Sequence, residues 1–272
     1  MNVGQAVALG VVEGVTEFLP VSSTGHLLIA ERLLGLQQDD ALIGFTAVVQ
    51  VGAILGAVVF FVRDIVSLLK AFLGGLISAD GRGAPDFPFS VAVLIGSIPI
   101  GIVGFALRDV VKSIDKQLVT VALGLIVFSI VLVIAERRAV QDRGERSITR
   151  VDALVIGLAQ CLALVPGVSR SGATISAGLL RGLDRVSATR LSFLLGIPAL
   201  LAAGAYELKD ASTAGTGGGT LLLATVVAFA VAYAVIAFLL RFVARHSIAA
   251  FVPYRVSLGV AVLVVLGVQA LA

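Results

Sequence analysis

Charged side chains are scarce in this sequence. Asp, Glu, Lys and Arg make up 14% of its 272 residues, and hydrophobic residues make up 58%. Soluble domains contain about 25% charged and roughly 45 to 50% apolar residues. A chain with so few charges cannot cover a surface that faces water. The composition therefore excludes a soluble domain and predicts an integral membrane protein.

The sequence also has only one cysteine and shows no pattern typical of a secretion signal. Cys161 is the single cysteine, which excludes an internal disulfide, and it has no partner at metal-ligand spacing, so we interpret it as a small packing residue. The N-terminus has no basic region or small-residue cleavage site, and its apolar start runs straight into Glu13. We expect this segment to belong to the mature protein.

Long uncharged runs, in contrast, are abundant. A helix that crosses a bilayer needs about 20 apolar residues. Four runs meet this length, and two shorter ones are bounded by Arg190 and Arg255. The six predicted spans of this all-α protein are Ala41–Val62, Pro88–Leu107, Gln117–Ala135, Leu191–Tyr206, Leu221–Leu240 and Val256–Ala272.

Two further apolar segments, Asn2–Leu34 and Val151–Leu180, are interrupted by polar, turn-forming residues. Pro20 and Pro166 should end the preceding helix, because proline lacks an amide hydrogen and clashes with the turn before it. Each half is then too short to cross the bilayer. We predict two re-entrant helical hairpins, whose loops must be buried in protein or line a wet cavity.

The two hairpins match each other at a shift of 147 positions, which pairs Gly10 with Gly157 and Ser22 with Ser169. We interpret the chain as a duplication, with a first repeat in residues 1–135, a linker in 136–150 and a second repeat in 151–272. Each repeat holds one hairpin and three spans. Because three is odd, the second repeat should be inverted relative to the first, so that the hairpins meet near the middle of the bilayer.

The basic residues predict the orientation. Fourteen Lys and Arg residues, Arg255 among them, fall on the side of the linker, and five fall on the other side. The positive-inside rule makes the linker side cytoplasmic and leaves both termini outside. The net charge of +3 then reflects topology and anionic lipid, and no nucleic-acid binding is expected.

Two acidic residues and a histidine lie in the first hairpin. Glu13 and Glu17 are four residues apart and share one helix face, where two carboxylates repel unless a cation or a shared proton intervenes. Ionisable groups inside a membrane are costly and mark functional sites. The alternative is a wet helix end that the two acids only solubilise. His26 is expected to handle protons or a metal, or else to be a satisfied interior histidine.

An anion site is predicted in the second hairpin. Arg170 is interpreted as the one basic residue inside the apolar segments, and it supplies a forked donor. Free amide hydrogens at the start of the next helix favour phosphate. The alternative is a structural arginine paired with Glu13 or Glu17. The residues expected around the anion are Gly167, Ser169, Ser171, Gly172 and Thr174, with Ser22 and Thr24 of the first hairpin, which could instead be helix caps.

The stretches "EGVTEFLPVSSTGH" (residues 13–26) and "PGVSRSGAT" (residues 166–174) resemble the two signature motifs of the undecaprenyl-diphosphate phosphatase family, also known as the bacitracin-resistance family. The similarity extends over essentially the whole chain. It implies six spans with two re-entrant hairpins in a bacterial plasma membrane, and an active site open to the periplasmic side. It also implies hydrolysis of undecaprenyl diphosphate to undecaprenyl phosphate, with Mg²⁺ or Ca²⁺ required.

The mechanism we expect assigns a role to each group. Arg170, with Ser169, Ser171 and Thr174, holds the diphosphate. Glu13 and Glu17 hold the cation. Ser23 attacks the terminal phosphorus with His26 as proton carrier, and a metal-activated water is the alternative nucleophile.

A transporter or flippase of a prenyl phosphate is the rival function, since inverted repeats with broken helices also build transporters. The surplus of acids, serine and histidine over what anion binding requires favours the enzyme. The expected partners are the prenyl diphosphate and membrane lipids, and the choice between a monomer and a homodimer stays open.

Overall fold

The computed structural model describes the backbone of residues 1–114, 117–210 and 217–271. Six helices in these ranges are long and apolar enough to cross a membrane. They are α3 (Asp40–Phe60), α6 (Phe87–Ala106), α8 (Leu118–Arg138), α11 (Arg185–Asp210), α12 (Gly218–Val243) and α13 (Val252–Leu271). Each overlaps one predicted span, so the chain is a multi-pass membrane protein. Of the residues that the span and charge predictions used, the side chains of Lys112, Lys116, Lys209 and Ala272 lie outside the described residues.

The arginines at the start of α11 explain why this helix begins earlier than the predicted span. Arg185 forms an ion pair with Glu136. Arg190 lies 2.6 Å from Asp64 and 2.7 Å from Glu145, counted between side-chain N and O atoms. Because both guanidinium groups have carboxylate partners, the helix can run through residues that a hydropathy reading places in a loop.

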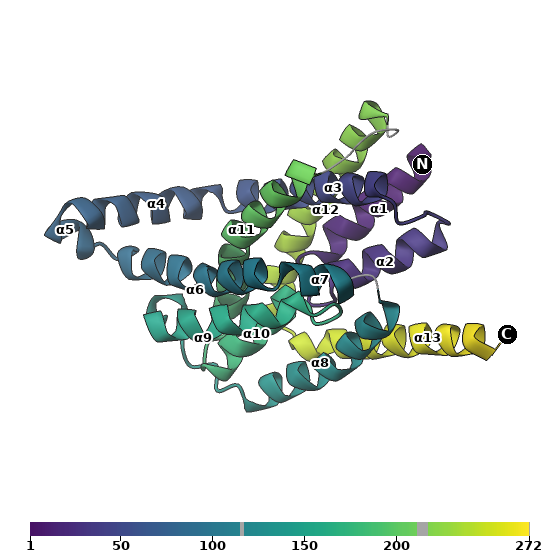
Figure 1. Cartoon of the computed structure of the whole chain (residues 1–272). Helices are drawn as coiled ribbons and strands as arrows, with labels where there is room; N and C mark the ends of the chain where they lie inside the picture. The colour runs from purple at the N-terminus through teal and green to yellow at the C-terminus, as the bar shows by residue number, and fades with distance from the viewer. Residues whose placement is uncertain (115–116, 211–216, 272) are drawn as a thin grey trace.

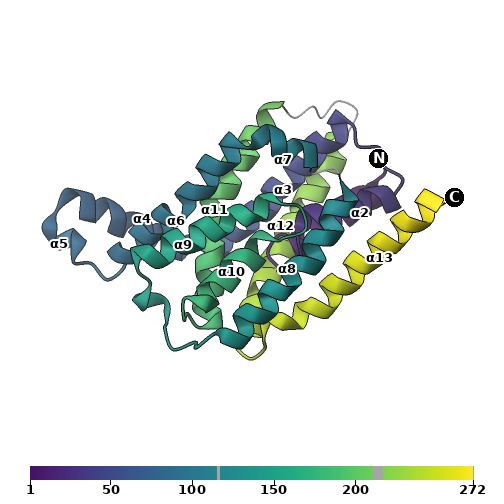
Figure 2. The same ribbon diagram turned by 60° about the horizontal axis from the view of Figure 1, so that its bottom comes forward.

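Two helical hairpins pack between the long helices. The first joins α1 (Val3–Thr16) to α2 (Ser23–Leu33), and the second joins α9 (Arg150–Gln160), through η2 (Cys161–Leu164), to α10 (Arg170–Leu180). With 11 to 14 residues, none of these α-helices reaches the length of a span. α1 packs on α12, and α9 packs on α6. α1 begins and α13 ends on the right of both views (Figures 1 and 2).

Corresponding positions of the two hairpins share unusual backbone geometry. Ser22 (φ 75°) and Ser169 (φ 79°) are both in the left-handed region, as are Gly35 (φ 68°) and Gly182 (φ 85°). Each pair is separated by the 147 positions of the sequence match. A serine with positive φ stores strain of about 1–3 kcal/mol, which persists only where the surroundings impose it. Both strained serines directly precede the second helix of their hairpin.

Glycine lets the hairpins approach the spans closely. A Cβ on Gly10 would lie 2.6 Å from the carbonyl oxygen of Ala224 in α12, and a Cβ on Gly157 would lie 2.3 Å from that of Gly96 in α6. Small residues allow such backbone contact between membrane helices. Gly10 and Gly157 are again a matched pair, so each hairpin sits against its span through the same kind of contact.

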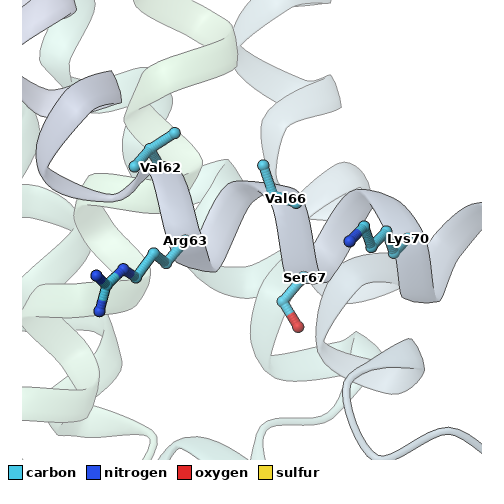
Figure 3. A pocket seen from close by; sticks show the side chains of 5 residues that line it. All are labelled: Val62, Arg63, Val66, Ser67 and Lys70. Carbon is cyan, nitrogen blue, oxygen red and sulfur yellow. The ribbon is translucent and has the colours of Figure 1, made fainter.

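The segment after α3, which was counted as a loop from the sequence, is an amphipathic helix. α4 (Val62–Ile77) is followed by the short α5 (Ala79–Arg82), and the two project from the side of the bundle (Figure 1). Val62 and Val66 point to one side of α4, and Arg63 and Ser67 point to the other (Figure 3). Charged residues interrupt this apolar stretch, so the helical spacing of its exposed apolar residues is not evident from hydropathy. These residues are Val62, Val66, Leu69, Leu73, Leu76 and Ile77.

The linker between the repeats is held by a buried carboxylate at the start of α9. Asp152 is fully buried and lies 2.6 Å from Arg143 and 2.7 Å from Arg181 in two ion pairs. Burial alone would raise the pKa of the Asp152 carboxyl, but hydrogen bonds from Arg143, Thr149 and Arg181 hold this pKa below its ordinary value. The arginine-rich linker is therefore tied to the second hairpin.

Candidate active site

A cavity of about 150 Å³ lies where the loops of the two hairpins meet. Polar residues from both loops line it together with apolar residues of the neighbouring helices. The lining residues are Glu17, Ser22, Ser23, Thr24, Gln50, Ile100, Ala163, Leu164, Pro166, Ser169, Arg170 and Leu200. A second, open hollow runs along α4 and is lined by Val62, Arg63, Val66, Ser67 and Lys70 (Figure 3). Its lining residues include no carboxylate.

A serine and a carboxylate are in direct contact in this cavity. The Ser23 hydroxyl donates a hydrogen bond of 2.6 Å to Oε2 of Glu17. Glu17 is the C-cap of α1, and Ser23 is the first residue of α2. The strained backbone of Ser22 sits between them in the chain. A hydroxyl that donates to a carboxylate has the arrangement of a nucleophile with its general base.

Arg170 faces this pair from the second loop. Its NH1 donates to the Ser192 carbonyl at 3.1 Å, and its NH2 lies 3.5 Å from Oε1 of Glu17. Among the described residues, Nε and NH2 have no hydrogen-bond partner, although they are buried. Buried donors without partners are costly. They therefore suit an anion that accepts two hydrogen bonds from one guanidinium group.

A glycine leaves room for the guanidinium group. A Cβ on Gly196, one turn after Ser192 in α11, would lie 1.9 Å from NH1 of Arg170. Arg170 also packs over the ring of Phe18 at 5.8 Å. The side chain of Arg170 is thus held from three sides.

The serines and the threonine of the second motif divide into two groups. Ser169 lines the cavity. Ser171 donates instead to the Leu19 carbonyl of the first loop at 2.9 Å, and Thr174 lies 2.6 Å from the Ser192 hydroxyl. Ser171 and Thr174 are fully buried and are not among the lining residues. Their hydroxyls hold the loop in place rather than facing the cavity.

Of the two serines with positive φ, Ser169 caps a helix with its side chain and Ser22 does not. The Ser169 hydroxyl accepts from the Gly172 amide at 3.2 Å and caps α10. Ser22 occupies the same position before α2 but makes no capping hydrogen bond, and it lines the cavity with Thr24. Gly167, also predicted at the anion, has φ 89° and packs against α8. Gly167 and Gly172 serve the loop backbone.

His26 contacts neither Ser23 nor Glu17 in the described hydrogen bonds. Its Nδ1 lies 2.7 Å from the Ser22 carbonyl, and its Nε2 lies 2.6 Å from the Tyr254 hydroxyl. Because a carbonyl oxygen only accepts, Nδ1 carries the proton and Nε2 accepts from Tyr254. The structure therefore places Glu17, and not His26, against the hydroxyl of Ser23.

The two acids of the first hairpin fit a hard divalent cation in part. Glu13 and Glu17 are 1% and 7% exposed, with Glu13 in the last turn of α1 and Glu17 at its C-cap. No third His, Cys, Asp or Glu joins them in the described part of the chain. Mg²⁺ is commonly bound by one or two carboxylates, with waters and substrate phosphates as the other ligands. Glu17 lines the cavity beside Arg170, whereas Glu13 is not among the lining residues, so the pattern is matched directly by Glu17.

Two residues near the loops were missed from the sequence. Gln50 of α3 lines the cavity, and nothing in its local sequence distinguishes a position that faces a cavity from one that faces another helix. The sequence also took Arg255 as the residue that bounds the last span, whereas α13 begins before it, at Val252. Arg255 is 0% exposed in α13, so Arg170 is also not the one basic residue within the apolar segments. The burial of Arg255 could not be predicted from the sequence. The residue lies at the edge of an apolar run, and its hydrogen-bond partners are distant in sequence.

Comparisons with known proteins agree with the sequence motifs. The family model described as "Bacitracin resistance protein BacA" matches residues 6–261. The chain is 56% identical to a protein of Acidothermus cellulolyticus named "Undecaprenyl-diphosphatase", over 98% of this chain and 97% of the relative. It is 52% identical to "Undecaprenyl-diphosphatase 1" of Streptomyces avermitilis, with the same coverage. A protein of Cutibacterium acnes named "Undecaprenyl-diphosphatase" is 47% identical over 97% of this chain and 96% of the relative.

Proposed function

The chain belongs to the bacitracin resistance protein family, and we propose that it hydrolyses undecaprenyl diphosphate to undecaprenyl phosphate and phosphate. The observation that carries this proposal is the contact between Ser23 and Glu17 in a cavity that also holds Arg170. A nucleophile, a base and an anion-binding group converge there from two separate loops.

The geometry supports a two-step mechanism. Ser23 Oγ attacks the terminal phosphorus while its proton passes to Glu17, and undecaprenyl phosphate leaves with the electrons of the broken P–O bond. Glu17 then passes this proton to the solvent. Water attacks the phosphoserine while Glu17 takes a proton from the water, the bond between phosphorus and Ser23 Oγ breaks, and Glu17 returns the proton to Ser23 Oγ as phosphate is released. Direct attack by a water molecule held at Glu17 is the alternative. His26 supports the first loop through its hydrogen bonds with the Ser22 carbonyl and the Tyr254 hydroxyl.

Charge neutralisation is the main task of a phosphoryl-transfer site. Nε and NH2 of Arg170, which make no hydrogen bond in the described part of the chain although NH2 is ion-paired with Glu17, would hold the equatorial oxygens of the phosphoryl group, and Ser169 and Thr24 line the same cavity. Glu13 and Glu17 would hold the divalent cation, Mg²⁺ or Ca²⁺, which neutralises charge on the diphosphate when it is bound. These residues are the proposed substrate and metal ligands.

We also propose the membrane arrangement of the chain. The two hairpins re-enter the bilayer from opposite faces as parts of an inverted repeat, with the linker in the cytoplasm. Both termini and the opening of the active site then lie on the outer side of a bacterial plasma membrane. The matched geometry of the hairpins and the distribution of basic residues support this arrangement.

Hydrolysis and lipid transport by the same fold predict different results with purified protein. A transporter needs the anion site but has no use for a serine hydrogen-bonded to a carboxylate, so that contact favours hydrolysis. The test is release of phosphate from a short-chain prenyl diphosphate by the protein in detergent with Mg²⁺ or Ca²⁺, because detergent solution offers no gradient to a transporter. We expect turnover, and its absence in a folded, metal-supplied preparation would refute the proposal.

A further inference from the structure

Arg255 is a fully buried cation whose donors all point at main-chain or hydroxyl oxygens. Its NH1 donates to the Pro20 carbonyl at 2.8 Å, and its NH2 lies 2.9 Å from the Gly167 carbonyl and 3.2 Å from that of Val168. Its remaining hydrogen bonds are with α8, through Ser129 and the carbonyl of Gly124, and its guanidinium group also lies over the ring of Phe128. In the described part of the chain no carboxylate lies within ion-pair distance of it.

These carbonyls belong to both hairpin loops. Pro20 follows Glu17 closely in the first loop, and Val168 directly precedes Ser169 and Arg170 in the second. A single planar guanidinium group thus joins the two loops at residues that border the reacting side chains. Arg255 comes from a third element, α13, which contributes no residue to the cavity lining.

The cost of this arrangement indicates that it does more than fill space. A buried cation without a counter-ion loses its hydration, and an apolar side chain would pack the same volume at a lower cost. What an apolar side chain lacks is the ability to fix several carbonyl groups in one plane. Guanidinium supplies five N–H donors in a rigid fork, and the ammonium group of lysine supplies three on a flexible stem.

We propose that Arg255 is a positioning residue for phosphoryl transfer, which holds the two loops at the separation at which Ser23 and Glu17 face Arg170. The inference rests on the proposed function. Between Arg170 and Glu17 the described distance is 3.5 Å, so a small slip between the loops changes it directly. A misplacement of about 1 Å at a reacting centre costs about 100-fold in rate.

The test compares Arg255→Lys and Arg255→Gln with the wild-type protein in detergent. Phosphate release from a short-chain prenyl diphosphate gives kcat and KM per folded molecule, and the melting temperature sets a working temperature at which each variant is folded. We expect kcat to fall at least about tenfold in both variants, with KM within about threefold of wild type. This pattern indicates loss of transition-state geometry rather than of substrate binding.

Two controls separate positioning from general packing. Ser129→Ala removes a contact of Arg255 with α8 and leaves its contacts with the loops, and Arg245→Lys makes the same exchange at an exposed arginine. Both should keep kcat within about twofold of wild type. A purely structural role of Arg255 would lower the melting temperature of its variants but leave kcat per folded molecule unchanged.

Either of two results would overturn the inference. One is an Arg255→Lys variant that folds and keeps wild-type kcat. The other is failure of both Arg255 variants to fold, which would assign the residue to assembly of the bundle. If the wild-type protein itself releases no phosphate, the proposed function has failed instead, so the two failures are distinguishable.

Discussion

Gly196 offers a way to displace Arg170 without changing any residue that faces the cavity. In Gly196→Ala the new methyl group would lie 1.9 Å from NH1 and 2.5 Å from Cζ of Arg170. Unstrained contacts between heavy atoms are about 3.5–4.0 Å, so the guanidinium group must retreat by about 1.5–2 Å. It then leaves the position from which we propose that Nε and NH2 hold the substrate.

The expected magnitude follows from the lost hydrogen bonds. A hydrogen bond to a charged group contributes about 1.5–3 kcal/mol, and each 1.4 kcal/mol is a factor of ten. We expect kcat/KM to fall about 10- to 100-fold. Stability should change little, because the clashing atoms are the far end of a side chain and alanine is favoured over glycine in a helix by about 1 kcal/mol.

The assay is phosphate release, with the melting temperature measured on the same preparations. Gly204→Ala is the matched control, since it lies in the same helix and its Cβ would meet Val51 at an ordinary 3.5 Å. It should keep full activity. A Gly196→Ala variant with wild-type kcat/KM would show that the described position of the guanidinium group is not needed for catalysis.

The remaining predictions concern the nucleophile, the cation and the topology. Ser23→Ala should abolish turnover at saturating metal, because no phosphoserine can form; substantial activity with unchanged metal dependence would assign the attack to water. Glu13→Gln should be partly rescued by excess Mg²⁺ or Ca²⁺, while Glu17→Gln should not, since Glu17 is also the proposed base; equal rescue of both would remove that distinction. In a cysteine-free background, Val140→Cys, at an exposed linker position, should react with a membrane-impermeant thiol reagent only from the cytoplasm, and Gln269→Cys only from outside. Labelling of both from one side would contradict the inverted repeat.

The long helices could be predicted from the sequence because hydropathy is a local property. Each predicted span overlaps a helix that is long enough to cross a membrane. α4 escaped prediction because Arg63, Asp64 and Lys70 interrupt its apolar residues, so that only the helical period reveals its exposed stripe. Counter-ions on other elements made the start of α11 equally hard to predict, since Arg185 and Arg190 pair with residues far away in sequence.

In the candidate site, too, the features set by local sequence could be predicted, and those set by contacts between distant residues could not. The motif spacing placed Ser23, Glu17 and Arg170 together, and the structure brings them into one cavity. The motif could not say which hydroxyls of the second loop face the cavity. Ser171 turns to a carbonyl of the first loop, and that partner is set by tertiary packing. Arg255 is the extreme case, because each of its hydrogen-bond partners lies more than 80 positions away.

The small volume of the cavity limits how much of a lipid substrate the protein can enclose. Pockets that enclose a drug-sized ligand measure about 300–1,000 Å³, whereas this cavity measures about 150 Å³. It can take a diphosphate and the first atoms of a prenyl chain, beside Ile100, Leu164 and Leu200, and the rest of the chain must stay among the acyl chains of the bilayer. The membrane is then the solvent of the reaction, and the rate depends on the mole fraction of substrate in that two-dimensional phase. Added detergent should slow turnover at a constant total amount of lipid, simply because enzyme and substrate come to occupy different micelles.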